Sequence, residues 1–588
     1  NAANVYSFTS GISMVAGRDY EMRFFHRVRL GSYPENYRVT LGTSQANTGN
    51  LDTLYNFNNY GTTTYAQASG NLYSCTSTGT YYFGFQCYSA ANQYDVYIDS
   101  VEVFEYIYVN NDASPVAMVN PGSSVCSTAD SVKIELKNSG QNALTSATIN
   151  WKVNGIAQTA KSWTGTLAPG ASETVNLGLY TYGSGTLFDM EFITSNPNAT
   201  TDGNTTNDTF ETSVNKGLSG TYTIGGTAPD YTTIAEAITA LESNGVCGPV
   251  VMDIRNGTYT EQLTIGAVAN VSATNTVTFK SETNNAANVT LTYASSVSAN
   301  RQTFKVDGGE YITLKHLTIK GAGTYAWPVH ILGGSEHITV SNCIISTPII
   351  SSSNRLPVVI NGSATSYTTG ALNNFITVDS CDISGGYLVI CIRGTSTSVR
   401  AKAPVFTNNT ITGYAYMGIY SYYTAAVKYS GNYIKAQVLN GLDYGVYCYY
   451  NTSDPTLGGI EISNNTVLTG YYGIYLSNCD GTSTARQKVF NNFISGSAYT
   501  STVYGLYNAG TDYCDYYHNS VWVKGPSGTS TKRAFYRSSG SNLKIQNNIF
   551  AVTGSGSTTQ SYAYYNGTSP NTTTMVVDDN VYYNTINP

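Results

Sequence analysis

The stretch IEISNNTV, residues 460–467, carries the pattern on which the rest of the chain is organised, apolar-x-apolar-x-x-Asn-x-apolar. Six more copies lie between residues 404 and 582, and three upstream copies have Leu or Cys in place of Asn. Aligned on the sixth position, the copies fall at Leu317, Cys343, Cys381, Asn409, Asn432, Asn465, Asn492, Asn519, Asn548 and Asn580. Steps of 23 to 38 residues with a fixed local motif predict a β-solenoid in which each copy is one coil.

The residue types within the motif fit one side of such a coil. Alternating apolar residues mark a short strand with one buried face. Stacked coils lie about 4.8 Å apart, so equivalent side chains form ladders. An Asn at a bend can hydrogen-bond to the Asn of the next coil, which satisfies a polar group that is costly to bury alone. Cys343 and Cys381 fill this position with small, nearly apolar side chains.

A second series of residues recurs with a similar period. Its members are 27 to 32 residues apart and are Cys391, Tyr420, Tyr447, Tyr475, Tyr507, Tyr536 and Tyr565. From Tyr420 on, each follows a small residue and then an apolar or aromatic one. Together the two series resemble the right-handed parallel β-helix of the pectin-lyase-like superfamily, over residues 217–588. That resemblance implies Asn ladders and aromatic stacks.

Composition bounds the class of protein. Charged residues make up only 11% of the 588 residues, which is typical of β-rich secreted proteins and unlike a cytosolic α/β enzyme. A net charge of −7 argues against a nucleic-acid partner. No apolar run approaches the length of a membrane span. No signal peptide is present, so we expect that it has been removed or that the numbering begins inside a precursor.

Ten cysteines allow disulfides without requiring them. Cys75 and Cys87 flank an expected hairpin and are the favoured pair. Cys343 and Cys381 lie on adjacent coils, where either a bond or two stacked buried thiols would fit. No CxxC pair or His cluster suggests zinc.

Residues 1–110 read as strands throughout. The run from Gly79 to Val103, GTYYFGFQCYSAANQYDVYIDSVEV, resembles the closing strands of the cleaved-adhesin type of jelly roll, apparently without its first strand. Those modules occur in secreted adhesins of Bacteroidota, and some bind calcium. Asp99 matches the first residue of the family's Asp-Asp pair, but Ser100 replaces the second. A surface Asp at a strand end is therefore favoured over a calcium site at Asp99, and no cofactor is required.

Residues 114–216 contain short alternating strands separated by turns, which predict a small sandwich. This part resembles the CARDB-like immunoglobulin modules of bacterial surface proteins, which usually act as spacers. Asp202, Asn207 and Asp208 could serve as cation ligands, although a polar hairpin tip explains them as well and is the preferred interpretation.

The third part, residues 217–588, opens with a capped helix. Thr233 and Glu236 form a capping-box pattern, Ile234 and Leu241 share one face, and Gly245 ends the helix. Such a helix would cover the first coil of a solenoid. The expected fold class is therefore all-β: a jelly roll and an Ig-like sandwich followed by a right-handed parallel β-helix with an N-terminal capping helix.

Neither end of the chain looks closed. The last repeat runs directly into residues 582–588, and an exposed coil end is a template for pairing. We therefore expect self-association through the N- and C-terminal ends, in a tandem or filamentous surface structure.

Many β-helices of this superfamily act on polysaccharides, a chemistry that needs acidic groups on adjacent coils of one outer face. One slot holds Lys428, Glu461, Lys488, Asp515 and Lys544 on successive coils. Glu461 and Asp515 would lie two coils apart, about 9.6 Å, near the separation in inverting glycosidases. Lys488 between them favours the charged form of both carboxylates, whereas a general acid must keep its proton. An ion-pair stripe is the favoured interpretation, and catalysis by these residues is the alternative.

Tyrosine is abundant, with 51 residues. Many are expected in internal ladders, while pairs such as Tyr422-Tyr423 and Tyr449-Tyr450 lie near coil corners and could contact sugars or proteins. The order of modules resembles Bacteroidota surface proteins exported by type IX secretion. We therefore expect a non-enzymatic extracellular adhesin or filament protein, with surface glycans or neighbouring cells as partners. The alternatives are a polysaccharide-active enzyme and a carbohydrate-binding array.

Overall fold

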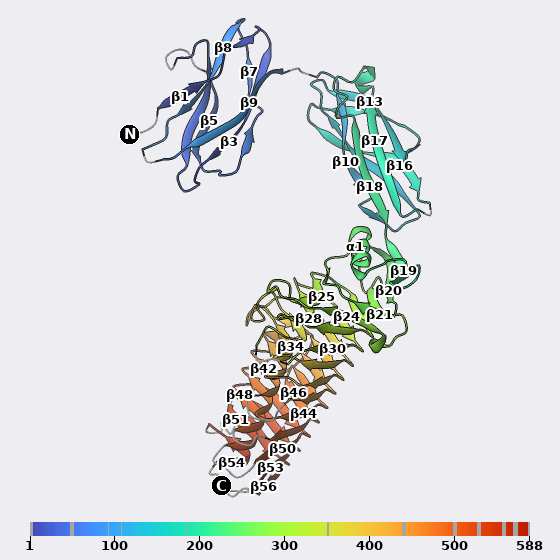
Figure 1. Ribbon diagram of the computed structural model, residues 1–588, viewed down its shortest axis with the longest axis vertical. Helices are drawn as coiled ribbons and strands as arrows, with labels where there is room; N and C mark the ends of the chain where they lie inside the picture. The colour runs from blue at the N-terminus through green and yellow to red at the C-terminus, as the bar shows by residue number, and fades with distance from the viewer. Residues whose placement is uncertain are drawn as a thin grey trace. The chain divides into compact units, whose positions relative to one another are not determined.

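The computed structural model describes residues 4–46, 52–91, 93–106, 109–183, 185–349, 352–437, 443–497, 502–525, 531–554, 560–568 and 574–585 (Figure 1). The chain forms two compact units. The first contains residues 1–119, 132–178 and 190–212, and the second contains residues 120–131, 179–189 and 213–588. The sequence predicted three domains, residues 1–110, 114–216 and 217–588, whereas the compact units are two. The three domain boundaries stay a prediction.

The N-terminal module is a sandwich of antiparallel strands. One sheet has the order β1-β8-β4-β5, with β2 also pairing with β8, and the other has the order β6-β3-β7, with β9 also pairing with β3. The strands are β1 (Val5–Phe8), β2 (Ile12–Met14), β3 (Asp19–Val28), β4 (Glu35–Gly42), β5 (Asp52–Tyr60), β6 (Ala66–Ala68), β7 (Leu72–Ser74), β8 (Gly79–Cys87) and β9 (Val96–Tyr106). Phe24, Val39 and Phe83 from the two sheets form its core.

The next module is a second antiparallel sandwich, as the alternating pattern predicted. Its sheets have the orders β10-β12-β16 and β11-β18-β17-β13-β14, with β15 also pairing with β13. The strands are β10 (Ala113–Asn120), β11 (Ser124–Val125), β12 (Ala129–Asn138), β13 (Leu144–Val153), β14 (Ile156–Ala157), β15 (Lys161–Leu167), β16 (Ser172–Thr181), β17 (Leu187–Ser195) and β18 (Thr209–Lys216). A 3-10 turn covers Pro197–Ala199.

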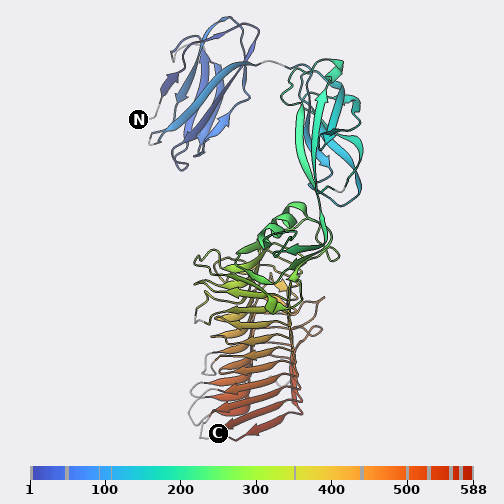
Figure 2. The same cartoon turned by 45° about the vertical axis from the view of Figure 1, so that its right-hand side comes forward.

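The remainder is a right-handed parallel β-helix built of three sheets whose strands stack in sequence order (Figures 1 and 2). The first sheet contains β19 (Leu218–Ile224), β20 (Val246–Ile254), β23 (Val277–Ser281), β26 (Ile312–Lys315), β29 (Thr339–Ser341), β32 (Thr377–Asp379), β36 (Val405–Thr407), β40 (Lys428–Ser430), β43 (Glu461–Ser463), β46 (Gln487–Phe490), β49 (Cys514–Tyr517), β52 (Leu543–Gln546) and β55 (Met575–Asp578).

The second sheet contains β21 (Gly257–Tyr259), β24 (Val289–Tyr293), β27 (Thr318–Gly321), β30 (Ile344–Thr347), β33 (Asp382–Gly385), β37 (Thr410–Thr412), β41 (Tyr433–Lys435), β44 (Thr466–Thr469), β47 (Phe493–Ser497), β50 (Ser520–Gly525), β53 (Ile549–Gly554) and β56 (Val581–Asn584). A 3-10 turn, Ala286–Asn288, precedes β24.

The third sheet contains β22 (Leu263–Ile265), β25 (Gln302–Asp307), β28 (Trp327–Leu332), β31 (Val358–Ile360), β34 (Leu388–Arg393), β38 (Met417–Tyr422), β42 (Tyr444–Tyr449), β45 (Tyr472–Ser477), β48 (Val503–Ala509), β51 (Lys532–Ser539) and β54 (Ser561–Asn566). A separate two-stranded ladder joins β35 (Ala401–Lys402) to β39 (Thr424–Ala425).

The Asn ladder forms as predicted, at the bend between the first and second sheets. In each step the upper Asn donates its backbone N–H and its Nδ2–H to Oδ1 of the Asn below, at 2.9–3.2 Å. Cys381 continues the ladder upward, because the N–H of Cys343 donates to its Sγ at 3.5 Å. Both thiols are buried and free, which confirms the stacked-thiol alternative.

The capping helix α1 (Ile234–Asn244) has the predicted boundaries. Thr233 and Glu236 form the capping box, and Gly245 follows the last turn with φ +66°. Ile234, Ala237, Ile238 and Leu241 are buried against the first coils. No helix in the described ranges is long and apolar enough to cross a bilayer.

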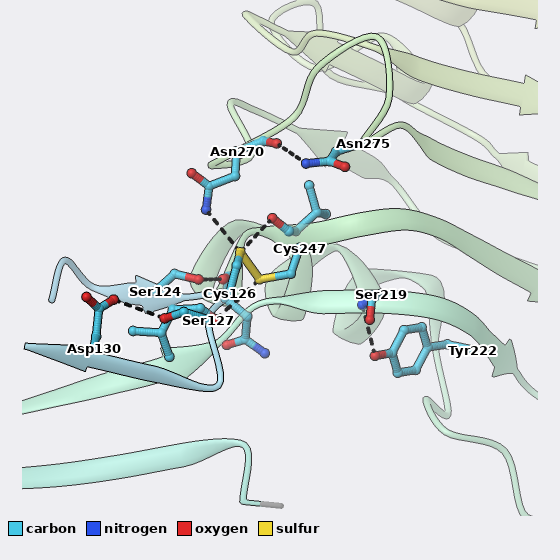
Figure 3. The surroundings of a disulfide bond; sticks show 12 residues. Ser124, Cys126, Ser127, Asp130, Ser219, Tyr222, Cys247, Asn270 and Asn275 are labelled. Atoms are coloured by element: carbon cyan, nitrogen blue, oxygen red, sulfur yellow. Dashed lines mark hydrogen bonds between the residues drawn. A yellow bond between two sulfur atoms is a disulfide. The ribbon is translucent and has the colours of Figure 1, made fainter. Parts of the chain in front are cut away.

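The predicted disulfide between Cys75 and Cys87 is wrong, because both thiols are free. Cys75 follows β7 in one sheet of the sandwich, whereas Cys87 ends β8 in the other sheet, so the two do not flank a hairpin. The disulfide joins Cys126 to Cys247, 121 residues apart and 5.0 Å between Cα atoms (Figure 3).

Candidate functional site

The stripe of alternating charges lies on the outer face of the first sheet, in the predicted register. Lys428 pairs with Glu461, Glu461 with Lys488, Lys488 with Asp515, and Asp515 with Lys544 on successive strands. The neighbouring positions Tyr429, Ile462, Val489, Tyr516 and Ile545 face the core and are buried. The five charged side chains therefore share one outward ladder.

The ion pairs within the stripe differ in one respect from the expected pattern. Lys428 Nζ lies 3.4 Å from Glu461 Oε1, as predicted for adjacent coils. Asp515, however, pairs with Arg486, whose Nε and Nη2 both donate to Oδ1 at 2.8 and 2.7 Å, and not with Lys488. Each carboxylate of the stripe thus has its own cation, and Oδ1 of Asp515 already accepts hydrogen bonds from two donors of Arg486.

A groove of about 540 Å³ lies farther up the same face of the first sheet. Three rings form one wall of it: His337 stacks on Tyr311, with centroids 4.5 Å apart and planes 7° apart, and on Phe375, at 4.7 Å and 4°. These residues precede β26, β29 and β32 on successive coils, and all three have φ between +52° and +55°. The ring spacing therefore equals the coil spacing.

The ring stack stops at Ala403, which occupies the same position on the next coil. The N–H of Phe375 donates to Lys402 O at 2.8 Å, which fixes that alignment, and Ala403 has φ +47° like the ring residues. Ala403 and the 44% exposed Leu457 both line the groove. At the position where a ring would continue the stack, Ala403 supplies only a methyl group.

Three threonines form the floor of the groove. Thr313, Thr339 and Thr377 are direct partners on β26, β29 and β32, and their neighbours on each strand face the core. Within the described part of the chain, their hydroxyls hydrogen-bond to no other side chain or backbone group. A second hollow of about 270 Å³, lined by Glu461, Arg486 and Lys488, shares Leu457 with this groove.

The tyrosine ladder forms as predicted, but on the outer face of the third sheet rather than inside the coil. Tyr447 and Tyr475 have ring centroids 4.9 Å apart with planes 2° apart, and Tyr507 continues the stack at 4.7 Å. A second column, Tyr416, Tyr444, Tyr472 and Tyr504, runs beside it. Because neighbouring rings cover one another, burial raises the pKa of Tyr447 and of Tyr472 above that of a free phenol.

A candidate cation cluster lies in the second sandwich. Asp112, Asp202 and Asp208 bring carboxylate oxygens within 4.8 Å of one another, and Asn207 donates to both oxygens of Asp112 at 3.0 and 3.2 Å. Burial and the charges of Asp202 and Asp112 raise the pKa of Asp208 to about 6. Asp202 and Asp208, which the sequence placed in a polar hairpin tip, therefore lie close to Asp112. The three carboxylates offer oxygen ligands of the kind that calcium prefers.

Asp99 is not part of this cluster, which is the one group of three or more acidic, His or Cys side chains in metal-binding range among the described residues. Asp99 is exposed in β9, and its Oδ1 accepts the N–H of Ser100 at 2.7 Å. A calcium site at Asp99, the less favoured of the two interpretations, stays untested.

Two features escaped sequence reasoning. The Tyr311–His337–Phe375 stack has a different residue at each coil, although each one directly precedes an Ile of the repeat, and that shared position could have revealed it. The contribution of Asp112 to the acidic cluster joins residues about 90 positions apart and has no local signal.

No family model matches the sequence, and no curated protein matches it. Among solved structures, the chain is similar to the pectin methylesterase PemA from Erwinia chrysanthemi, at 15% identity over 44% of this chain and 82% of that one, with a TM-score of 0.29. It is similar to the DFA-IIIase from Arthrobacter chlorophenolicus A6, at 10% identity over 56% and 83%, with a TM-score of 0.34.

The chain is also similar to the CARDB domain of a Pyrococcus furiosus protein solved in complex with di-metal ions. The identity is 17% over 19% of this chain and 100% of that one, with a TM-score of 0.17.

Proposed function

We propose that the chain is an extracellular structural or adhesive protein whose β-helix serves as a rigid shaft and carries out no reaction. The observation that supports this most is the ion pairing of the charged stripe. Glu461 is held by Lys428 and Asp515 by Arg486, so neither carboxylate is free to act as an acid or a base on a bound substrate. The stripe instead stabilises neighbouring coils.

The shaft is stiffened where it begins. The disulfide between Cys126 and Cys247 ties the segment before β12 to β20 of the first coil, and Ser124 Oγ donates to Asn244 O beside it (Figure 3). Disulfides persist in oxidising environments, which supports the extracellular location. Display at a bacterial surface, and export by type IX secretion, are part of this proposal.

Self-association through the end of the β-helix is also part of the proposal. Val577 and Tyr582 continue the core ladders of Ile545 and Phe550, which are 0% exposed, yet they are 41% and 47% exposed themselves. Strands β55 and β56 thus present apolar residues and an edge to which a strand of a second molecule can pair. Residues 586–588 lie outside the described part of the chain.

A polysaccharide screen tests the absence of chemistry. The purified protein is incubated with methyl-esterified pectin, polygalacturonate and inulin, and reducing ends, unsaturated products and methanol are measured. We expect the same background from the wild type and from a Glu461→Gln/Asp515→Asn double variant. Turnover by the wild type that the double variant loses would overturn the proposal in favour of a polysaccharide-active enzyme.

A further inference from the structure

We propose that the groove on the first sheet binds a neutral glycan, with one pyranose ring stacked on Phe375 in the place that a ring at Ala403 would fill. This glycan site would give the proposed adhesive protein its ligand. The inference rests on the proposed function only in treating the bound glycan as the target of adhesion. Three features support it: the ring stack, the threonine floor and the charge of the lining.

The ring stack defines a place of fixed size and orientation. Tyr311, His337 and Phe375 are parallel at 4.5 and 4.7 Å, so both faces of His337 are covered by rings, whereas the face of Phe375 toward Ala403 meets no further ring. A flat apolar face placed over Ala403 would continue the stack by one coil spacing, about 4.8 Å. The C–H face of a pyranose has this shape, and aromatic faces favour such contacts.

The threonine floor favours a sugar over an aromatic ligand. Thr313, Thr339 and Thr377 present three hydroxyls in a row, one coil apart, and these hydroxyls have no partner among the described residues. Each hydroxyl can both donate and accept a hydrogen bond. A ligand with an apolar face and a hydroxyl-bearing edge can stack on the ring wall and hydrogen-bond to the threonine floor. A plain aromatic ring would leave the threonine hydroxyls without hydrogen bonds.

The lining of the groove sets the charge of the ligand. None of its lining residues is acidic or basic, His337 aside, and the cation beside Ala403, Lys402, is already paired with Asp454 at 3.4 Å. A uronate would lose its hydration here without gaining a cation. The groove therefore suits neutral hexoses or pentoses.

Isothermal titration with four linear hexasaccharides, of β-1,4-glucose, β-1,3-glucose, β-1,4-mannose and β-1,4-xylose, tests the proposal on the full chain. We expect at least one to bind, and we expect Ala403→Phe to weaken that binding about tenfold or more because the new ring occupies the sugar's place. Ala403 already has the backbone conformation of Phe375, so this variant is expected to fold.

Two further variants and one control complete the test. Phe375→Ala removes the platform and Thr377→Val removes one hydroxyl at constant shape, and both should weaken binding. Phe493→Ala removes a 44% exposed ring from the second sheet and should leave binding unchanged. No binding by any of the four at 10 mM, or binding that Ala403→Phe leaves intact, overturns the proposal. Neither result bears on whether the protein self-associates or lacks enzymatic activity.

Discussion

Asn409 donates both its backbone N–H and its Nδ2–H to Oδ1 of Asn432, each at 3.0 Å, so one side-chain oxygen closes two hydrogen bonds between adjacent coils. Asn432 repeats this geometry with Asn465, and Nδ2 of each Asn also donates to a backbone carbonyl one coil above. The ladder thus satisfies the buried bend of every coil from Cys381 down to Asn580.

Replacing Asn465 by Ala should destabilise the β-helix by about 2–4 kcal/mol. The change leaves the N–H of Asn432 and the carbonyl of Tyr429 buried without their partners. Urea unfolding followed by circular dichroism measures the loss. Lys435→Ala, an exposed change on a neighbouring coil, should stay within about 0.5 kcal/mol. Equal effects of the two variants would show that the ladder is not a source of stability.

Reduction of the Cys126–Cys247 bond should lower stability by about 4 kcal/mol, because it releases a loop of 121 residues in the unfolded chain. Peptide mapping of the unreduced protein should find this link and a free thiol at Cys75. Melting with and without reductant gives the size of the effect, and Cys75→Ser serves as the control. A mapped bond between Cys75 and Cys87 would contradict the structure.

The second sandwich should be less stable at pH 7 than at pH 5. The carboxyl of Asp208 has a pKa of about 6 in the folded state, against about 3.9 in an unfolded chain. Because the folded pKa is the higher one, the unfolding free energy falls as the pH rises from about 4 to 6, here by about 1–2 kcal/mol. Calorimetry of the wild type and of Asp208→Asn at both pH values measures this. A pH dependence that survives in the variant would assign it to other groups.

The outer tyrosine columns should make the β-helix sensitive to alkali. Burial raises the pKa of Tyr447 and Tyr472 above that of a free phenol, so their contribution to stability is present at neutral pH and is lost as the pH rises above about 10. Absorbance at 295 nm should show that these phenols ionise only together with unfolding. Tyr475→Phe keeps the stack and should leave stability at pH 7 nearly unchanged. Ordinary ionisation without unfolding would mean that the rings do not cover one another.

The β-helix was predictable because its signal is local and repeated: each coil contains the same short strand and the same bend residue. The inward or outward direction of a ladder was harder to predict. Tyr420 directly follows the buried Ile419, and strict alternation places it outside, although an aromatic residue so regularly spaced looked like core. Tyr420 is half-buried because the tyrosines of adjacent coils cover its ring. The residue pattern of a single strand does not show this contact.

The parts that the sequence did not reveal depend on contacts between distant segments. Cys126 and Cys247 lie in different sequence modules, whereas proximity in the sequence favoured Cys75 and Cys87. Asp515 pairs with Arg486, which lies at the bend before β46 and not in the slot of alternating charges. In both cases the chain path around a bend, and not the strand pattern, decides which side chains meet.

Electron microscopy of the purified protein tests the central claim, that this is a structural protein which associates through the end of its β-helix. We expect fibres or end-to-end particles for the wild type, and single particles for Val581→Lys, which places a charge on the exposed edge strand β56. Leu179→Lys, at a 71% exposed position of the second sandwich, should associate like the wild type. Separate particles of the wild type at every concentration would contradict the claim.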